Sequence, residues 1–188
     1  MSKPGDQLDP DTIYRMHVHQ VGRWVARLGG PSVDVEDTVH DIFAIAFARL
    51  GGFRGDSSVA TWLFGITDKV VGQRRRKSRW WRWPSGTAEQ TAGALPAAGP
   101  DPLQVFEQVQ AARDVYRVLD RLSPGDRRIL ILFELEGLAA DQVGELLGIK
   151  AANARLRLHR ARARFLRSYQ REFPSPDAKL ERCGHVSP

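Results

Sequence analysis

The chain has 188 residues, of which 42% are hydrophobic and 27% charged, a composition typical of one globular domain or two small ones. The net charge of +6 and a pI of about 10.0 favour nucleic acid or another anionic surface as a partner. A single cysteine excludes an internal disulfide framework and a multi-thiolate zinc site.

The N-terminal sequence MSKPGDQLDPDT is polar and lacks the apolar core of a signal peptide. No stretch approaches the roughly 18–20 apolar residues that a bilayer-spanning helix needs. These two features predict a soluble, cytoplasmic protein with no membrane span.

The first half of the chain predicts three helices after a disordered segment at residues 1–11. The first runs over about 12–28 and ends at Gly29-Gly30-Pro31. Asp34 is a good N-cap for the second, in which apolar residues recur at helical spacing up to Leu50. A polar loop over 53–58 follows, and Ser57 or Ser58 can cap a third helix that begins near Ala60 and continues towards Arg76.

The composition then changes. Residues 74–83 read RRRKSRWWRW, and residues 84–102 are rich in Pro, Gly and Ala with little periodic apolar content. This pattern predicts a flexible linker over 84–104 between a first domain at 12–83 and a second at 105–172, followed by a mobile tail at 173–188. No strand pattern of useful length is present, so the expected fold is all-α, with two small helical domains.

The second half begins with one predicted apolar stripe and a strong helix start. The Ser123-Pro124-Gly125-Asp126 sequence combines an N-cap, a proline in the first turn and an acidic third position. The helix is expected to continue through 129–135 and to end at Gly137. The stripe before it contains Val105, Val109, Ala112, Tyr116 and Leu119.

Residues 139–147 and 151–171 predict two helices joined by a glycine-containing turn, which is the pattern of a helix-turn-helix. Gly148 permits the positive φ of the turn, and Gly144 is expected where the two helices approach closely. In the second helix, four residues are expected to pack inward: Ala154, Leu158, Ala161 and Phe165. The opposite, outward side carries Ala152, Asn153, Arg155, Leu156, His159 and Arg160, with Arg157 on its flank.

The first turns of such a helix read base edges in the DNA major groove. Asn153 suits adenine, the arginines suit guanine, and Leu156 suits the methyl group of thymine. Further along, Arg162, Arg164 and Arg167 are expected to meet phosphates. The alternative is a solvated basic helix that makes no base contact.

The segment LSPGDRRILILFELEGLAADQVGELLGIKAANARLRLHRARARFL resembles region 4 of bacterial sigma factors in the extracytoplasmic-function (ECF) group. Independently, VEDTVHDIFAIAFARLGGFRGDSSVATWLFGITDKVVGQRRR resembles region 2 of the same group. The resemblance covers about 12–80 and 106–168, in the expected order, and implies a non-enzymatic transcription initiation factor.

The resemblance implies that region 2 docks on the β′ clamp helices of core RNA polymerase and melts the promoter −10 element. It implies that region 4 docks on the β flap and reads the −35 element, and that an anti-sigma factor is a further partner. For the −10 element the implied residues are Phe53, Arg54, Asp56, Ser57, Ser58, Trp62, Lys69, Arg74 and Arg75. For the polymerase they are Glu36, Asp37, His40, Asp41 and Phe43. From the residues alone, the 53–58 loop is equally an ordinary surface connection, and helix capping is the alternative role of the acidic residues.

The chain also departs from the family pattern. His40 stands where the family usually has Gln, and Thr67-Asp68-Lys69 stands where Ala-Arg-Asn is common. Residues 153–157 read NARLR in place of a typical Thr-Val-Lys-Ser-Arg. These changes put specific −10 contacts in doubt and indicate an unusual −35 preference.

Other features predict no catalytic site, cofactor or metal. His17 and His19 point apart on a helix, and Cys183 with His185 supplies too few ligands for a closed site. The tryptophans at 80, 81 and 83 fit either packing against the linker or a protein contact. Two other functions stay open: a stand-alone helix-turn-helix regulator, which leaves 34–77 unexplained, and a recombinase-type enzyme, which lacks a recognisable nucleophile.

Overall fold

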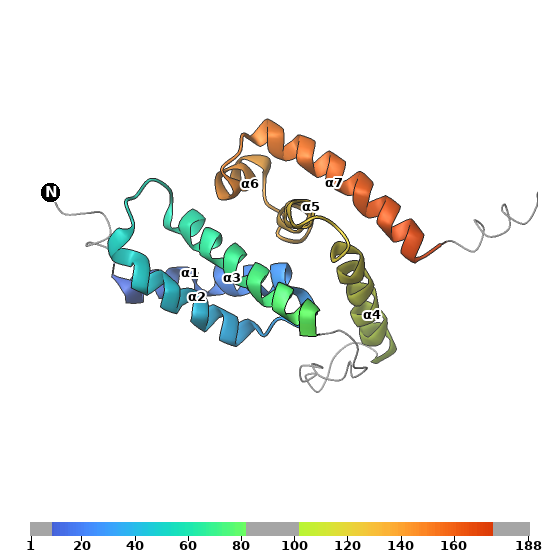
Figure 1. The fold of residues 1–188 in the computed structure, drawn as a ribbon, viewed down its shortest axis with the longest axis horizontal. Coiled ribbons are helices and arrows are strands. Elements are labelled where there is room, and N and C mark those ends of the chain that lie inside the picture. The colour runs from blue at the N-terminus through green and yellow to red at the C-terminus, as the bar shows by residue number, and fades with distance from the viewer. Residues whose placement is uncertain (1–8, 82–101, 175–188) are drawn as a thin grey trace, which may run out of the picture. The chain divides into compact units, whose positions relative to one another are not determined.

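The computed structural model describes residues 9–81 and 102–174, and every regular element within these two ranges is helical (Figure 1). The chain divides into two compact units, the first containing α1 to α3 and the second containing α4, α5, α7 and most of α6. The all-α fold is therefore confirmed. Most of the predicted linker and nearly all of the predicted tail lie outside the described residues.

The first unit consists of three long helices with short 3-10 turns between them. They are α1 (Pro10–Gly29), η2 (Gly30–Ser32), α2 (Val35–Arg49), η3 (Leu50–Gly52) and α3 (Val59–Trp81).

Side-chain caps fix the starts of these helices. Asp9 accepts a hydrogen bond from the Thr12 amide at 2.9 Å and another from its hydroxyl at 2.8 Å, and these bonds lower the pKa of Asp9. Asp34 caps α2 as predicted, because its side chain accepts from the Asp37 amide at 3.0 Å. Because α1 begins at Pro10, the last two residues of the segment expected to be disordered are helical.

The core of the first unit lies where the three helices meet. Trp24 of α1 and Phe64 of α3 are 1% and 2% exposed, and their rings meet edge to face with centroids 5.1 Å apart. Around this pair, the buried apolar residues of α1, α2 and α3 interdigitate, including Val21, Val25, Ile42, Phe43, Ala46 and Leu63.

The second unit holds the predicted helix-turn-helix. Its elements are α4 (Pro102–Leu119), α5 (Pro124–Leu130), the π-helical turn η4 (Ile131–Leu135), α6 (Ala140–Leu147) and α7 (Ala151–Glu172). Ser123 caps α5 as predicted, accepting from the Asp126 amide at 3.1 Å.

Three predictions for this unit are corrected. α4 begins at Pro102, so residues 102–104 are helical instead of linker. Among the stripe residues of α4 whose side chains are described, burial is confined to the end of the helix: Val109 is 46% exposed and Leu119 is 3% exposed. The reason is that α4 meets α7 near the C-terminal ends of both helices, where Arg121 pairs with Glu172.

The expected continuous helix over 129–135 widens into a π turn, in which the Glu136 amide donates to the Ile131 carbonyl at 2.9 Å.

A buried arginine joins α5 to the end of α4. Arg127 is 3% exposed, its Nη1 donates to Asp120 Oδ1 at 2.9 Å, and its guanidinium lies 5.4 Å from the centre of the Tyr116 ring. A buried charge of this kind is stable only when it is paired. The contact therefore makes the α4–α5 corner dependent on Arg127.

The helix-turn-helix is closed by a contact that only glycine allows. The Ile149 amide donates to the Gly144 carbonyl at 2.9 Å, and a Cβ added to Gly144 would lie 2.6 Å from the Ile149 carbonyl oxygen. Gly148 adopts a φ of 63°, which favours glycine over other residues. The predicted close approach at Gly144 and the predicted turn at Gly148 are both confirmed.

We predict that Gly144→Ala destabilises the second unit by about 1–3 kcal/mol, because the new methyl group must displace the backbone of Ile149. Hydrogen exchange of the α7 amides measures this loss in the second unit alone. Gly125→Ala is the matched control, since a Cβ there meets nothing within 4 Å. Equal exchange of the α7 amides in the two variants would show that the close approach at Gly144 does not contribute to stability.

Candidate nucleic-acid interface

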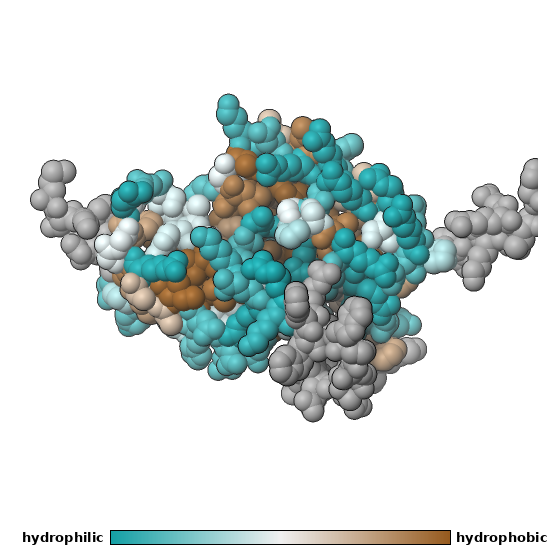
Figure 2. Space-filling view, viewed as in Figure 1, coloured by the Kyte–Doolittle hydropathy of each residue, from teal (hydrophilic) through white to brown (hydrophobic). Residues whose placement is uncertain are grey.

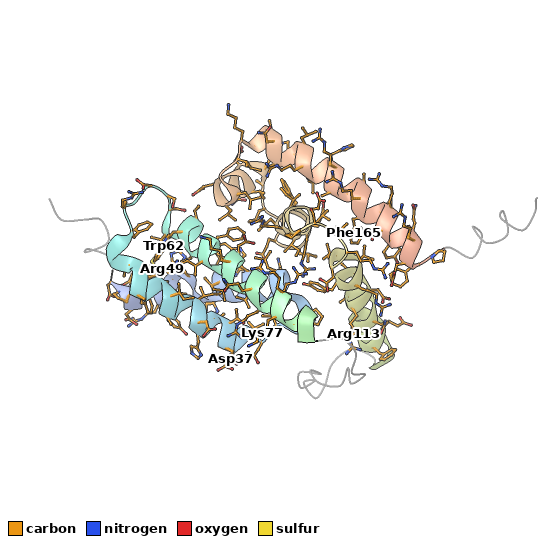
Figure 3. All side chains as sticks on the ribbon, in the orientation of Figure 1. Asp37, Arg49, Trp62, Lys77, Arg113 and Phe165 are labelled. Carbon is orange, nitrogen blue, oxygen red and sulfur yellow. The ribbon has the colours of Figure 1, made fainter. Side chains whose placement is uncertain are left out.

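The structure places the predicted reading face of α7 on the surface. All seven of its residues are exposed, and Leu156 at its centre is 49% exposed. On the opposite side, Ala154, Leu158 and Ala161 are buried and Phe165 is half-buried, and Figure 3 shows Phe165 on the side of α7 towards α4 and α5. The side of α7 that was predicted to pack inward is buried in the structure, and the side that was predicted to face outward is exposed. The exposed set is Ala152, Asn153, Arg155, Leu156, Arg157, His159 and Arg160.

The dimensions and charge of this face suit duplex DNA. An α-helix with its side chains is about 10–12 Å in diameter, close to the roughly 12 Å width of the DNA major groove. Residues 150–171 contain eight Lys or Arg and no Asp or Glu. Figure 2 shows hydrophilic residues along most of the visible side of α7. A helix with this net positive charge attracts a polyanion.

Two of the arginines expected to meet phosphates are engaged within the protein. Arg162 Nε donates to Glu134 Oε1 of η4 at 2.7 Å, and Arg164 Nη1 donates to Asp126 Oδ1 of α5 at 2.7 Å. Local sequence patterns do not predict these partners, because they lie 28 and 38 residues away in the chain. Both guanidiniums therefore hold α7 against its own domain.

In the first unit, the 53–58 loop combines a buried anchor with exposed polar groups. Phe53 is 8% exposed and packs on Trp62, with ring centroids 5.1 Å apart. Arg54 forms an exposed ion pair with Asp56 at 3.2 Å. The Ser58 hydroxyl accepts from the Thr61 amide at 3.2 Å and caps α3. Ser57 is also exposed, so the loop presents polar groups on a base fixed by Phe53.

The basic residues of α3 lie on different sides of the helix. Lys69 is exposed, whereas Arg74 is turned towards α2, where it pairs with Asp41 and donates to the Asp37 carbonyl at 3.5 Å. Arg75 is half-buried. Residue 74 lies about 24 Å along the helix axis from Ser58, so the loop and the basic end of α3 are separate places on one helix.

The acidic residues expected to meet polymerase lie on the surface of α2. Glu36, Asp37, His40 and Asp41 are exposed, and Figure 3 shows Asp37 at the start of α2. The expected polymerase contact of Phe43 is corrected, because its side chain is 3% exposed and therefore belongs to the core.

Sequence reasoning missed the aromatic residues that surround Phe43. The centre of the Tyr14 ring lies 4.8 Å from that of the Phe43 ring, and the centre of the Phe47 ring lies 5.8 Å from it. Tyr14 and Phe47 are each 36% exposed. The four-residue spacing of Phe43 and Phe47 was the available signal, since residues so spaced share a helix face.

Within the described ranges, no cluster of three or more His, Cys, Asp or Glu residues could hold a metal ion. No helix there is long and apolar enough to cross a membrane. Cys183 and His185 lie outside these ranges, as do Trp83 and the linker over 84–101.

Comparison with known families identifies both units. Residues 13–82 match the model described as Sigma-70 region 2, and residues 112–165 match the model described as Sigma-70, region 4. Over 171 residues the chain is 30% identical to the ECF RNA polymerase sigma-E factor of Escherichia coli K12, an alignment that covers 84% of this chain and 85% of that protein. The chain belongs to the ECF group of the sigma-70 family.

A second relative aligns over much of this sigma factor. It is 29% identical over 172 residues to the ECF RNA polymerase sigma factor SigE of Mycolicibacterium smegmatis. The alignment covers 90% of this chain, which spans 64% of the length of that relative.

Solved structures share the fold. CnrH in complex with the cytosolic domain of CnrY superposes with a TM-score of 0.56 at 21% identity, covering 88% of this chain and 89% of that one. The sigma factor RpoE in complex with the anti-sigma factor NepR from Bartonella quintana gives 0.54 at 22% identity, covering 85% and 96%.

Family membership makes this protein a sigma factor, a subunit that directs promoter-specific transcription. The match to region 2 explains the segment that a stand-alone helix-turn-helix regulator leaves without a role. That alternative is therefore not favoured.

Proposed function

We propose that this sigma factor binds core RNA polymerase and reads the promoter −35 element with the outward face of α7. The observation that carries the proposal is the exposure of all seven residues of that face on a helix held by a buried stripe. Asn153 and the arginines offer hydrogen bonds to base edges, and Leu156 offers an apolar contact to a thymine methyl group. The unusual 153–157 sequence then corresponds to an unusual −35 preference.

The 53–58 loop is the proposed place where the first unit holds melted −10 DNA. Unstacked bases are held by aromatic side chains and polar loop groups. Here Phe53 is the buried anchor, while Arg54, Asp56, Ser57 and Ser58 are accessible to a base. Trp62 supports the loop through Phe53, and Lys69 offers a charge to the DNA backbone.

The exposed acidic residues of α2 form the proposed contact with the β′ clamp helices, and the second unit is the proposed partner of the β flap. Because CnrH and RpoE are each described in complex with a second protein, an anti-sigma factor is a proposed partner here. We assign the protein to the bacterial cytoplasm, where polymerase and promoter DNA meet, with retention at the membrane by an anti-sigma factor as a further proposal. Its role is that of an initiation factor rather than an enzyme.

Run-off transcription with purified core polymerase tests the proposed function. We expect promoter-specific product only when the full chain is added to the core enzyme and a template that carries its promoter. The Glu36→Arg/Asp37→Arg variant should lose binding to core polymerase, because it reverses the exposed charge at the start of α2. A wild-type chain that fails to bind core polymerase would refute the proposal.

We predict that Arg160→Ala weakens binding to a −35 duplex by about 1–3 kcal/mol, as expected when a base contact is lost. Leu156→Ala should reduce discrimination at a single base pair, with a smaller effect on overall affinity. Footprinting and titration measure both effects. Arg171→Ala is the matched control, because Arg171 is exposed on the same helix but lies eleven residues beyond Arg160. If Arg160→Ala and Leu156→Ala both bind as the wild type does, the assignment of the reading face is wrong.

A further inference from the structure

The buried stripe of α7 is flanked by an ion pair on each side. Each residue advances about 100° around a helix, so Arg162 lies to one side of Ala161 and Arg164 lies to the other side of Phe165. Arg162 reaches Glu134 in η4, and Arg164 reaches Asp126 in α5, each at 2.7 Å. The two contacts therefore hold opposite flanks of α7.

The two acceptors are themselves fixed by the fold. Asp126 is 14% exposed on its side chain, and its second oxygen, Oδ2, accepts a hydrogen bond from the Ser123 hydroxyl at 2.8 Å. The N-cap of α5 thus orients the carboxylate that binds Arg164. Glu134 lies in the π turn, whose backbone differs from a regular helix and sets where that side chain projects.

Rotation of α7 about its own axis would break one of these pairs. The buried stripe, which includes the fully buried Ala154 and Ala161, opposes large rotations, whereas the two flanking ion pairs oppose small ones. Even a small rotation would move Leu156 away from the centre of the outward face. The rotational setting of α7 thus determines which side chains can reach base edges.

We propose that Arg162 and Arg164 are positioning residues: through Glu134 and Asp126 they fix the rotation of the recognition helix and so its base preference, instead of contacting phosphates. This inference rests on the proposed reading of −35 DNA by α7. The arginines of α7 then fall into two classes: those that contact DNA and those that set the rotation of the helix.

The salt dependence of DNA binding separates the two classes. Each phosphate neutralised by a basic side chain contributes about 0.9 to the slope of log K against log salt. The probe is a duplex selected by the wild-type chain from a randomised pool, compared with a scrambled duplex, and the protein is the full chain. Arg160→Gln should lower the slope or the affinity, because Arg160 lies on the reading face.

Arg162→Gln and Arg164→Gln should leave the slope unchanged and lower the preference for the selected over the scrambled duplex. The expected loss is on the order of two- to fivefold for each variant, the range that exposed ion pairs support. A slope that falls by about 0.9 in either variant would overturn the proposal, because it would identify that arginine as a phosphate contact. If Arg160→Gln changes neither the slope nor the affinity, the proposed −35 reading face is wrong. That outcome differs from a fall in slope in Arg162→Gln or Arg164→Gln, so the two failures are distinguishable.

The carboxylate partners give an independent test. Glu134→Gln and Asp126→Asn each raise the net charge by one, so an electrostatic role alone predicts tighter binding and no loss of preference. We expect each carboxylate variant to lose as much preference for the selected duplex as the variant of its arginine partner. The double variants Arg162→Gln/Glu134→Gln and Arg164→Gln/Asp126→Asn should lose no more preference than the single variants. Additive losses in both pairs would contradict the proposal. Circular dichroism confirms that each variant is folded before the binding is compared.

Discussion

The close approach of Gly144 to Ile149 is the contact on which the DNA-facing part of the molecule depends. It brings the middle of α6 against the turn before α7 at a distance that no Cβ can occupy. Gly148 then turns the chain with a positive φ, so that α7 leaves the turn in one direction. With that direction set, the stripe of Ala154, Leu158 and Ala161 is buried, and the opposite side of α7 remains exposed.

Ion pairs then determine which charges are available to partners. In the second unit, Arg162 and Arg164 are occupied by acidic residues of η4 and α5, which leaves Arg155, Arg157 and Arg160 on the outward face. In the first unit, Arg74 is held by Asp41, so a predicted DNA contact is paired with a predicted polymerase contact. A count of basic residues therefore overstates the charge that is free to bind DNA.

Local signals in the sequence were sufficient for the helices and for the two faces of α7. Asp34 and Ser123 were identifiable as caps, and Gly144 and Gly148 as parts of a tight turn, because each effect acts within a few residues. The partners of Arg162 and Arg164 were not predictable, since tertiary packing brings them together. Periodicity also failed for α4, because a repeating apolar pattern does not reveal how far the neighbouring helix extends. The family resemblance implied a polymerase contact for Phe43, whereas its helical spacing and its 3% exposure place it in the core.

The central claim is that the centre of the outward face of α7 touches −35 DNA when the sigma factor is bound to polymerase. Photo-crosslinking from position 156, with Leu156→p-benzoyl-phenylalanine in the reconstituted holoenzyme, tests it most directly. We expect a crosslink to bases of the −35 element and none when the same group replaces Leu166, which is exposed further along α7. A crosslink from position 156 only to polymerase, or to no −35 base, would contradict it.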